Sequence, residues 1–249
     1  MSAVAERELA ARFDAIGLDD LVSEAALLTR VDRKYVVPRA DLPLIVGGLR
    51  AGTRALEIDG VRDFAYRSVY FDTPELLSFH LAARPRRRRF KIRTRSYEDT
   101  GGAFLEIKTR GARGTTAKER AEYRAELDRL PLEAREEIEQ SLAAIGVEES
   151  VADRLQPTLT SSYRRTTLLG IDGARATIDT DLAWCDATGP ELRLAEVAIV
   201  ETKSAARASD ADRVLWRQGH RPVSVSKYAT GLAALRPTLP RNRWSRLLR

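Results

Sequence analysis

From residue 90 to residue 95 the chain reads FKIRTR. Side chains alternate between the two faces of a β-strand, so residues two positions apart point the same way. Lys91, Arg93 and Arg95 therefore share one face, and the apolar residues of the segment take the other. The pattern predicts a strand that buries one side in a core and carries a row of cations on its opposite side.

Two later segments repeat this arrangement of charge. Glu106 and Lys108 share one strand face, and so do Glu201 and Lys203. For any one strand, the ordinary explanation is that the charged face meets water. Several strands built alike favour a different explanation, because a sheet that curls closed brings its polar faces to one interior. An interior lined with cations must hold something anionic.

Lysine is rare in this chain, although basic residues are not. Of 42 basic residues only six are lysine, and each lies in a short patterned segment. An ammonium is a compact, strongly hydrated point charge, which the planar guanidinium of arginine does not replace. Phosphate is the usual ligand of such charges. The six lysines are Lys34, Lys91, Lys108, Lys118, Lys203 and Lys227.

The composition excludes several classes of site. A single cysteine, Cys185, rules out an internal disulfide. Two histidines, His80 and His220, are too few for a zinc site of the usual thiolate and imidazole type. A metal bound here would be a hard cation held by carboxylates. The net charge of +6 over 249 residues favours an acidic partner, which is nucleic acid, anionic lipid or a phosphorylated small molecule.

The two ends of the chain and its apolar runs bear on localisation. The apolar runs are too short to span a membrane, and the N-terminus lacks the basic start and apolar stretch of a signal peptide. These features predict a cytoplasmic protein. Residues 1–28 are expected to form an amphipathic N-terminal helix. The basic tail, residues 236–249, is expected to be a solvated terminus in preference to a nucleic-acid or membrane contact.

Periodicity and turn signals predict the elements between these ends. Strands are expected at residues 29–37, 64–72, 90–97, around 106–108, 115–123, 159–169, 174–182 and 192–203. Helices are expected at 40–50, 74–81, 131–146, 208–218 and 226–235. About eight mostly antiparallel strands with helices between them predict an α+β fold. A closed β-barrel in a single domain, residues 1–249, is the economical arrangement, and its interior can hold one narrow ligand.

Several short segments, in this order and spacing, carry a family resemblance. They are RKY at 33–35, SVYFDT at 68–73, KIRTR at 91–95, EIK at 106–108, YRRT at 163–166, RATIDTDL at 175–182, ETK at 201–203 and SKY at 226–228. From Thr29 to Leu235 the chain resembles the VTC domain, the polyphosphate polymerase branch of the triphosphate tunnel metalloenzymes. The resemblance implies an eight-stranded antiparallel tunnel that holds triphosphate or polyphosphate together with Mn²⁺ or Mg²⁺.

The resemblance also implies roles for particular residues. Glu201 falls where the family places its metal carboxylate, with Asp32, Glu106 or Asp179 as possible helpers. Lys91 and Lys118 match the phosphate-binding pattern less closely than the other bases. The bases that fall at phosphate-binding positions are Lys34, Arg93, Arg95, Lys108, Arg165, Arg175, Lys203 and Lys227.

Simpler explanations exist for some of these residues. Glu106 and Glu201 are also explained as partners of Lys108 and Lys203 that neutralise the interior. Asp179 is more readily a turn or hydrogen-bonding residue than a metal ligand. The tyrosines of the motifs are more readily core or rim aromatics than platforms for a base. These tyrosines are Tyr35, Tyr70 and Tyr228.

Two positions depart from the family pattern. The hydrolytic relatives open with Glu-x-Glu-x-Lys, whereas residues 30–34 read RVDRK, so Arg30 replaces the first carboxylate. Weaker metal binding on that strand argues against a plain triphosphatase and favours the polymerase branch. Ser224 stands where the polymerase relatives carry another lysine, which leaves one tunnel mouth less basic. Together the two departures also favour a binding protein without activity.

The resemblance therefore implies a metal-dependent polyphosphate polymerase, in which the terminal phosphate of a growing chain attacks ATP and ADP leaves. One alternative is a tripolyphosphatase or nucleoside triphosphatase on the same scaffold. Another is a non-catalytic sensor or carrier of polyphosphate. Nucleic-acid binding is disfavoured because no aromatic platform accompanies the basic strands. A membrane partner that receives the product, and the oligomeric state, stay open.

Overall fold

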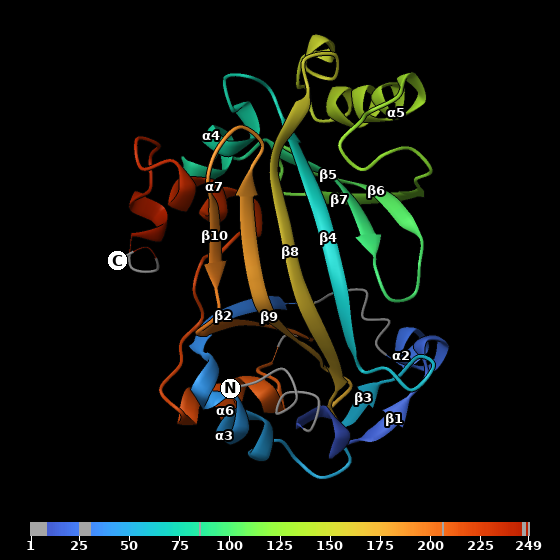
Figure 1. Ribbon diagram of the computed structural model, residues 1–249, viewed down its shortest axis with the longest axis vertical. Helices are drawn as coiled ribbons and strands as arrows, with labels where there is room; N and C mark the ends of the chain where they lie inside the picture. Colours follow the sequence, from blue (N-terminus) through green and yellow to red (C-terminus); the bar gives the residue numbers. More distant parts are fainter. Residues whose placement is uncertain (1–8, 25–30, 85, 206, 246–247, 249) are drawn as a thin grey trace. The chain divides into compact units, whose positions relative to one another are not determined.

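The computed structural model describes residues 9–24, 31–84, 86–205, 207–245 and 248 (Figure 1). The chain forms two compact units. Unit 1 comprises Met1–Ala65, Tyr163–Leu182 and Arg193–Val225. Unit 2 comprises Tyr66–Ser162, Ala183–Leu192 and Ser226–Arg249. The single domain expected from the sequence stays a prediction.

Each unit combines strands with helices. The elements of unit 1 are β1 (Asp14–Ile16), α2 (Leu18–Glu24), β2 (Val31–Pro38), the 3₁₀ turn η1 (Arg39–Asp41), α3 (Leu42–Gly47), β3 (Arg54–Leu56), β11 (Val197–Ser204) and α6 (Asp210–Arg217). Those of unit 2 are α4 (Leu77–Ala83), β5 (Arg89–Tyr97), β6 (Ala103–Arg110), β7 (Thr116–Glu122), α5 (Leu132–Ala143), η2 (Glu149–Val151), α7 (Lys227–Leu235) and η3 (Asn242–Trp244). Four strands contribute residues to both units, namely β4 (Asp63–Asp72), β8 (Gln156–Leu169), β9 (Arg175–Asp186) and β10 (Glu191–Leu194).

The strands belong to a mainly antiparallel sheet. Neighbours run in the order β2-β11-β9-β8 in unit 1 and β8-β4-β5-β6-β7 in unit 2. The ladders β2–β11, β11–β9, β4–β5, β5–β6 and β6–β7 are antiparallel. The predicted antiparallel sheet with flanking helices is confirmed. In the described part of the chain the sheet has 11 strands instead of eight, and its hydrogen-bonded order ends at β2 and β7. Closure into a barrel is therefore not confirmed.

The core of unit 1 lies between one sheet face and two helices. Alternate residues of β2 and β11, such as Tyr35 and Val200, are almost fully buried. They pack with Ile45 of α3 and Leu215 of α6 in one hydrophobic cluster. Figure 1 shows α3 and α6 beside each other. Burying each such large apolar side chain stabilises the fold by roughly 1.5–3 kcal/mol, so this cluster holds β2 and β11 in place.

The core of unit 2 confirms the alternation read from residues 90–95. Ile92 of β5 and Ile107 of β6 are buried, and they pack with Ile138 and Leu142 of α5. The residues between them, which include Lys91 and the other cations, take the opposite sheet face. The amphipathic helix expected at 131–146 is the element that covers the apolar face.

Helix α4 begins later than expected. The sequence predicts a helix start at Pro74, but α4 begins at Leu77, because Leu76 has a left-handed backbone (φ 58°) that no helix continues through. Asp72 still binds the start of this helix, since its carboxylate accepts the N–H groups of Ser78 and Phe79 over 2.8 and 2.9 Å. The carboxylate thus satisfies donors that a helix N-terminus leaves without partners.

Two sequence-based expectations about secondary structure are wrong. Residues 1–8 and 25–30 lie outside the described residues, but within the expected N-terminal helix Asp14–Ile16 forms strand β1. It pairs in parallel with β3, and the partner is distant in sequence, which local periodicity cannot reveal. Residues 192–203 were expected to be one strand, but a turn at 195–196 divides the segment into β10 and β11.

Most described residues of the basic tail are exposed, as expected of a solvated terminus, but Trp244 is packed. Trp244 of η3 is only 2% exposed, and its ring centroid lies 6.0 Å from that of Phe79. Arg243 Nη1 donates a hydrogen bond to the backbone oxygen of Ala82 over 2.8 Å. Burial of a large indole explains why the tail docks, because it removes much apolar surface from water.

No helix in the described ranges is both long enough and apolar enough to cross a membrane.

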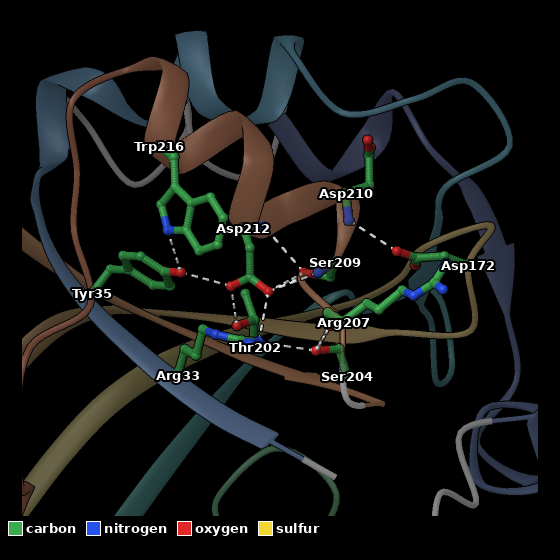
Figure 2. A network of polar contacts seen from close by, with 10 residues as sticks. All are labelled: Arg33, Tyr35, Asp172, Thr202, Ser204, Arg207, Ser209, Asp210, Asp212 and Trp216. Atoms are coloured by element: carbon green, nitrogen blue, oxygen red, sulfur yellow. Dashed lines mark hydrogen bonds and ion pairs between the residues drawn. The ribbon is translucent and has the colours of Figure 1, made fainter.

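A buried carboxylate joins β2, β11 and α6 in unit 1. Figure 2 shows Asp212 at the centre of this network, which we call the Asp212 network. Tyr35 and Thr202 donate to its Oδ1 over 2.7 and 2.6 Å, and Arg33 Nη1 donates to its Oδ2 over 3.1 Å. Ser209 and Asp212 also form a capping box at the start of α6. The network therefore fixes α6 against one face of the sheet. Lys34 and Glu201 lie on the other face.

Replacing Asp212 should destabilise unit 1. Asp212→Ala removes the carboxylate that accepts from the Arg33 guanidinium and from the hydroxyl groups of Tyr35, Thr202 and Ser209, and loss of one partner of a buried pair costs about 3 kcal/mol or more. Urea unfolding should show this loss in the free energy of unfolding. Arg213→Ala, on the exposed side of the same helix, is the control. An equal effect of both changes would contradict a special role for Asp212.

Candidate functional site

The predicted site residues gather in two sets, one in each unit. We call them the β11 cluster, in unit 1, and the β5 cluster, in unit 2. The β11 cluster consists of Lys34, Arg165, Arg175, Glu201 and Lys203, with Asp32, Thr177 and Asp179. The β5 cluster consists of Lys91, Arg93, Arg95, Glu106, Lys108, Lys118 and Lys227, with Ser68, Tyr70 and Ser226.

Strand register brings the β11 cluster together. In the antiparallel ladders Glu201 lies opposite Lys34 on one side and opposite Thr177 on the other. Lys203, two residues further on, lies opposite Asp32 and Arg175. These residues share the sheet face that turns away from the core of unit 1, because their neighbours in sequence are the core residues. Three separate motifs thus meet on one face.

Glu201 is the carboxylate between the two lysines of this cluster. Its oxygens lie 3.6 Å from Lys203 Nζ and 4.0 Å from Lys34 Nζ. Charge-assisted hydrogen bonds are about 2.7–2.9 Å long, so these are looser ion pairs. The predicted pairing of Glu201 with Lys203 is present, and Lys34 joins it. The arrangement leaves both ammonium groups able to approach an anion as well.

Arg165 is oriented by a buried acid. Its Nε and Nη2 donate to the two oxygens of Asp179 over 2.6 and 2.8 Å, and the Asp179 side chain is fully buried. Such a two-pronged pair fixes the plane of the guanidinium. Asp179 is therefore a hydrogen-bonding residue, which the sequence favoured over a metal ligand.

The surroundings of Lys203 in this cluster shift its pKa. Burial lowers its pKa to about 8, the charge of Glu201 opposes this shift, and the charge of Arg175 adds to it. Its side chain is only 18% exposed. A lysine in this state gains from a nearby anion, because an added negative charge favours the ammonium form.

Thr177 is a member of the cluster that sequence reasoning did not assign to the site. Its hydroxyl oxygen is buried and has no hydrogen-bond partner among the described residues. It lies directly opposite Glu201 in the β9–β11 ladder. A buried hydroxyl without a partner is costly, and a ligand oxygen at this face would remove that cost. The sequence could have identified Thr177, because side chains alternate along a strand and Thr177 therefore shares a face with Arg175 and Asp179.

In the β5 cluster Glu106 binds two arginines. Arg93 Nε donates to Glu106 Oε2 over 2.7 Å, and Arg95 Nη1 lies 3.5 Å from Oε1. Arg93 stands directly opposite Glu106 in the ladder, whereas Lys108 faces Lys91, and the pairing of Glu106 with Lys108 stays a prediction. Burial favours a raised pKa for Glu106, but the two arginines outweigh it and hold the pKa below its usual value.

Tyr70 and Ser68 of β4 complete this part of the cluster. Arg93 Nη1 donates to the Tyr70 hydroxyl and Arg95 Nε donates to Ser68 Oγ, each over 3.2 Å. Burial would raise the pKa of Tyr70, yet Arg93, Arg95 and Lys227 together lower it. Tyr70 is fully buried and stacks on Tyr228, which agrees with the expected core role of both tyrosines. The structure adds a contact with the cations that the sequence did not predict.

The start of α7 belongs to the β5 cluster. Ser226 caps this helix through the N–H of Ala229, and Lys91 Nζ donates to Ser226 Oγ over 3.1 Å. Lys227 is the first helical residue. Helix N-termini carry partial positive charge, so the cap region adds to the positive potential of the two lysines.

The two lysines furthest along the ladder are exposed. Lys118 of the edge strand β7 stands opposite Lys108 of β6, and both side chains are open to solvent. Arg120, which shares their face, lies over the Phe104 ring at 3.7 Å. Lys118 therefore extends the cationic face, while Arg120 is held by an aromatic contact.

The two family departures fall in different places. Arg30 lies outside the described residues. Ser224 lies in the exposed segment that leads into α7.

Glu201 and Asp32 are the carboxylates of the β11 cluster that could serve as ligands of a metal ion. Within the described ranges no three His, Cys, Asp or Glu side chains group so that they could hold a metal ion. Mg²⁺ at phosphate sites commonly uses one or two carboxylates and takes its other ligands from phosphate and water. Glu201 fits this requirement as a hard oxygen donor, while Glu106 and Asp179 are bound by arginines.

Comparison with known structures identifies the class of fold. A candidate adenylyl cyclase from Hippeastrum, in which triphosphatase activity dominates, is 15% identical with a TM-score of 0.51 over 86% of this chain and 100% of that one. A candidate adenylate cyclase from Vibrio parahaemolyticus is 12% identical with a TM-score of 0.45 over 82% and 98%. The antiparallel sheet with flanking helices therefore has the fold of the Hippeastrum protein.

A sequence profile identifies the family to which the chain belongs. The VTC domain family profile matches residues 29–236, which is most of the chain. The chain therefore belongs to the VTC domain family, and the resemblance read from the sequence motifs is confirmed at this level. No curated protein matches the sequence.

The pKa of Lys203 gives a test, because two substitutions near it should shift this pKa in opposite directions. Side-chain NMR of the lysines should give Lys203 an apparent pKa near 8, assigned by loss of its signal in Lys203→Arg. Glu201→Gln removes a charge that favours the ammonium and should lower this pKa. Arg175→Gln removes an opposing charge and should raise it. A wild-type pKa at the ordinary value of about 10.4, or shifts in one direction, would contradict the geometry.

Proposed function

We propose that this protein is a phosphotransferase that moves the γ-phosphate of ATP onto a growing polyphosphate chain. The observation that carries the proposal is the β11 cluster, where Lys34, Lys203 and two arginines surround Glu201 on the face turned from the core. Membership of the VTC domain family supports it. Such a set of side chains suits an anion with several phosphates and offers no hydrophobic binding surface.

The proposed reaction needs no nucleophile from the protein. A terminal oxygen of the polyphosphate chain bonds to the γ-phosphorus of ATP, the bond from that phosphorus to the bridging oxygen breaks, and ADP leaves with the electron pair. Negative charge spreads over the transferred group in the transition state. Fixed positive charge at that point lowers the barrier without reorganisation.

Lys34 and Lys203 supply this charge in the β11 cluster. Both ammonium groups already lie within 4.0 Å of Glu201, so little movement is needed to contact a phosphoryl oxygen nearby. Binding of the anion raises the fraction of Lys203 that is protonated, because an opposite charge favours the ammonium form. Arg165, fixed by Asp179, and Arg175 bind the phosphates that do not react.

The β5 cluster binds phosphate groups in the same proposal. Arg93 and Arg95 are held by Glu106, Tyr70 and Ser68, so their guanidinium groups are fixed before a ligand arrives. Fixed donors lose less entropy on binding than mobile ones do. The lysines of this cluster are Lys91, Lys108, Lys118 and Lys227.

Glu201 would hold a Mn²⁺ or Mg²⁺ ion together with phosphate oxygens and water. When bound, such an ion neutralises charge on the phosphates.

A product assay tests the reaction. Incubation with ATP and Mn²⁺ should yield long phosphate chains and ADP. Lys203→Ala and Glu201→Gln should each lower the rate about 100-fold, the usual effect of removing one group that stabilises transition-state charge. Arg213→Gln, which removes a charge from the exposed side of α6, should leave the rate unchanged.

The other outcomes of this assay select the other functions. Free phosphate without chains would identify a triphosphatase. ATP binding without turnover, unaffected by Glu201→Gln, would identify a sensor or carrier. Either result would overturn the proposed polymerase activity.

Ligand binding should also stabilise the folded protein. Tripolyphosphate binds only the folded state, so the melting temperature should rise with its concentration, by the equivalent of about 2.7 kcal/mol at 100 times the dissociation constant. Sodium chloride at equal ionic strength is the control, because it screens the cations without occupying the clusters. No shift at ~1 mM tripolyphosphate would contradict phosphate binding at either cluster.

A further inference from the structure

The cationic face of unit 2 continues beyond the β5 cluster. Two residues before Lys91 stands Arg89, and two residues after Lys108 stands Arg110. These arginines are direct partners in the β5–β6 ladder, on the same face as the lysines. At about 3.3 Å per residue, the new pair lies roughly 7 Å further along the strands. The cationic row therefore has an extension that the family motifs do not include.

Like charges placed opposite each other destabilise a sheet, so this pair needs an explanation. Three influences act on the Arg89 guanidinium: burial, the charge of Arg110 and the charge of Arg243, and each lowers its pKa. Arg93 and Arg95 differ, because Glu106 balances them. The same strands thus carry one arginine pair that Glu106 balances and one pair that no acid balances in the part of the chain that the structure describes.

Arg110 shows a second sign of a missing ligand. Its Nε is buried and has no hydrogen-bond acceptor among the described residues. A buried charged donor without an acceptor costs more than a neutral one. The planar guanidinium offers two parallel donors to a phosphate group, so a phosphate oxygen is a suitable acceptor.

The docked tail supplies the third cation. Burial of Trp244 against Phe79 and the hydrogen bond from Arg243 to Ala82 hold η3 on unit 2. This places the charge of Arg243 close enough to act on Arg89. The tail therefore contributes a cation to this site.

We propose that Arg89, Arg110 and Arg243 form a second anion site, which binds the phosphates of a linear polyphosphate chain beyond those held by the β5 cluster. The proposal rests on the proposed function. A triphosphate is bound by the β5 cluster alone, whereas a longer chain that follows the strand face reaches the arginines.

Calorimetric titration with two ligands tests this site. Tripolyphosphate and a long-chain polyphosphate of defined length are titrated into the wild type, Arg110→Gln and Arg89→Gln at fixed salt. Each change should weaken binding of the long chain at least about tenfold, since a hydrogen bond to a charged group contributes about 1.5–3 kcal/mol. Affinity for tripolyphosphate should stay within about twofold, since that ligand does not reach the pair.

A matched variant controls for the loss of one positive charge. Arg67 is exposed on β4, in the same unit, and its neighbours Tyr66 and Ser68 point to the cationic face, so Arg67 points away from it. Arg67→Gln should leave the affinity for both ligands unchanged. Melting curves of all variants establish that each is folded.

The outcomes separate this site from the proposed function. If Arg110→Gln and Arg89→Gln bind the long chain as tightly as Arg67→Gln does, the second site is overturned while tripolyphosphate binding still supports the proposed function. If the wild type binds neither ligand, both fail. If single-stranded DNA of equal charge displaces the long chain equally well, the site is a general polyanion surface and the proposal for polyphosphate is overturned.

Discussion

Balance of like charge on the strand faces is the constraint on which both clusters depend. Two unit charges about 4 Å apart interact by about 4 kcal/mol at an effective dielectric constant of 20, which is a large fraction of the stability of a typical domain. Glu201 lies between Lys34 and Lys203, and Glu106 binds Arg93. These acids hold the cations together without neutralising each set, because the cations in each cluster outnumber them. The remaining positive charge is the basis of the phosphate binding that we propose.

Side chains alternate along each strand, so the same strand contributes residues to a charged face and to a hydrophobic core. Thr202 lies between Glu201 and Lys203 in sequence, and its hydroxyl group donates a hydrogen bond to Asp212 of α6. In unit 2, Ile92 and Ile107 pack under α5 while their neighbours form the β5 cluster. Each short motif therefore combines residues that anchor the strand with residues of a charged cluster. A core change in these segments would move the cations as well.

Sequence reasoning predicted the parts that depend on local pattern. Each expected strand segment contains a strand, although residues 192–203 form two, and the family resemblance is confirmed over residues 29–236. What local pattern did not reveal are partners distant in sequence: β1 pairs with β3, Glu106 binds Arg93, and Trp244 of the tail packs against Phe79. Closure of the sheet into a barrel depends on such pairings too and is not confirmed by the ladders.

The sequence by itself determined which residues share a strand face, because side chains alternate with a period of two whatever the surroundings. It also determined the choice of lysine, arginine and carboxylate, which is the chemical basis of the proposed phosphate binding. Only the tertiary structure decided which cations are balanced by an acid, as Arg93 is by Glu106, whereas no acid among the described residues is paired with Arg89. It decided the lowered pKa of Lys203 as well. Both depend on strand register and burial, which arise when segments far apart in the chain pack together.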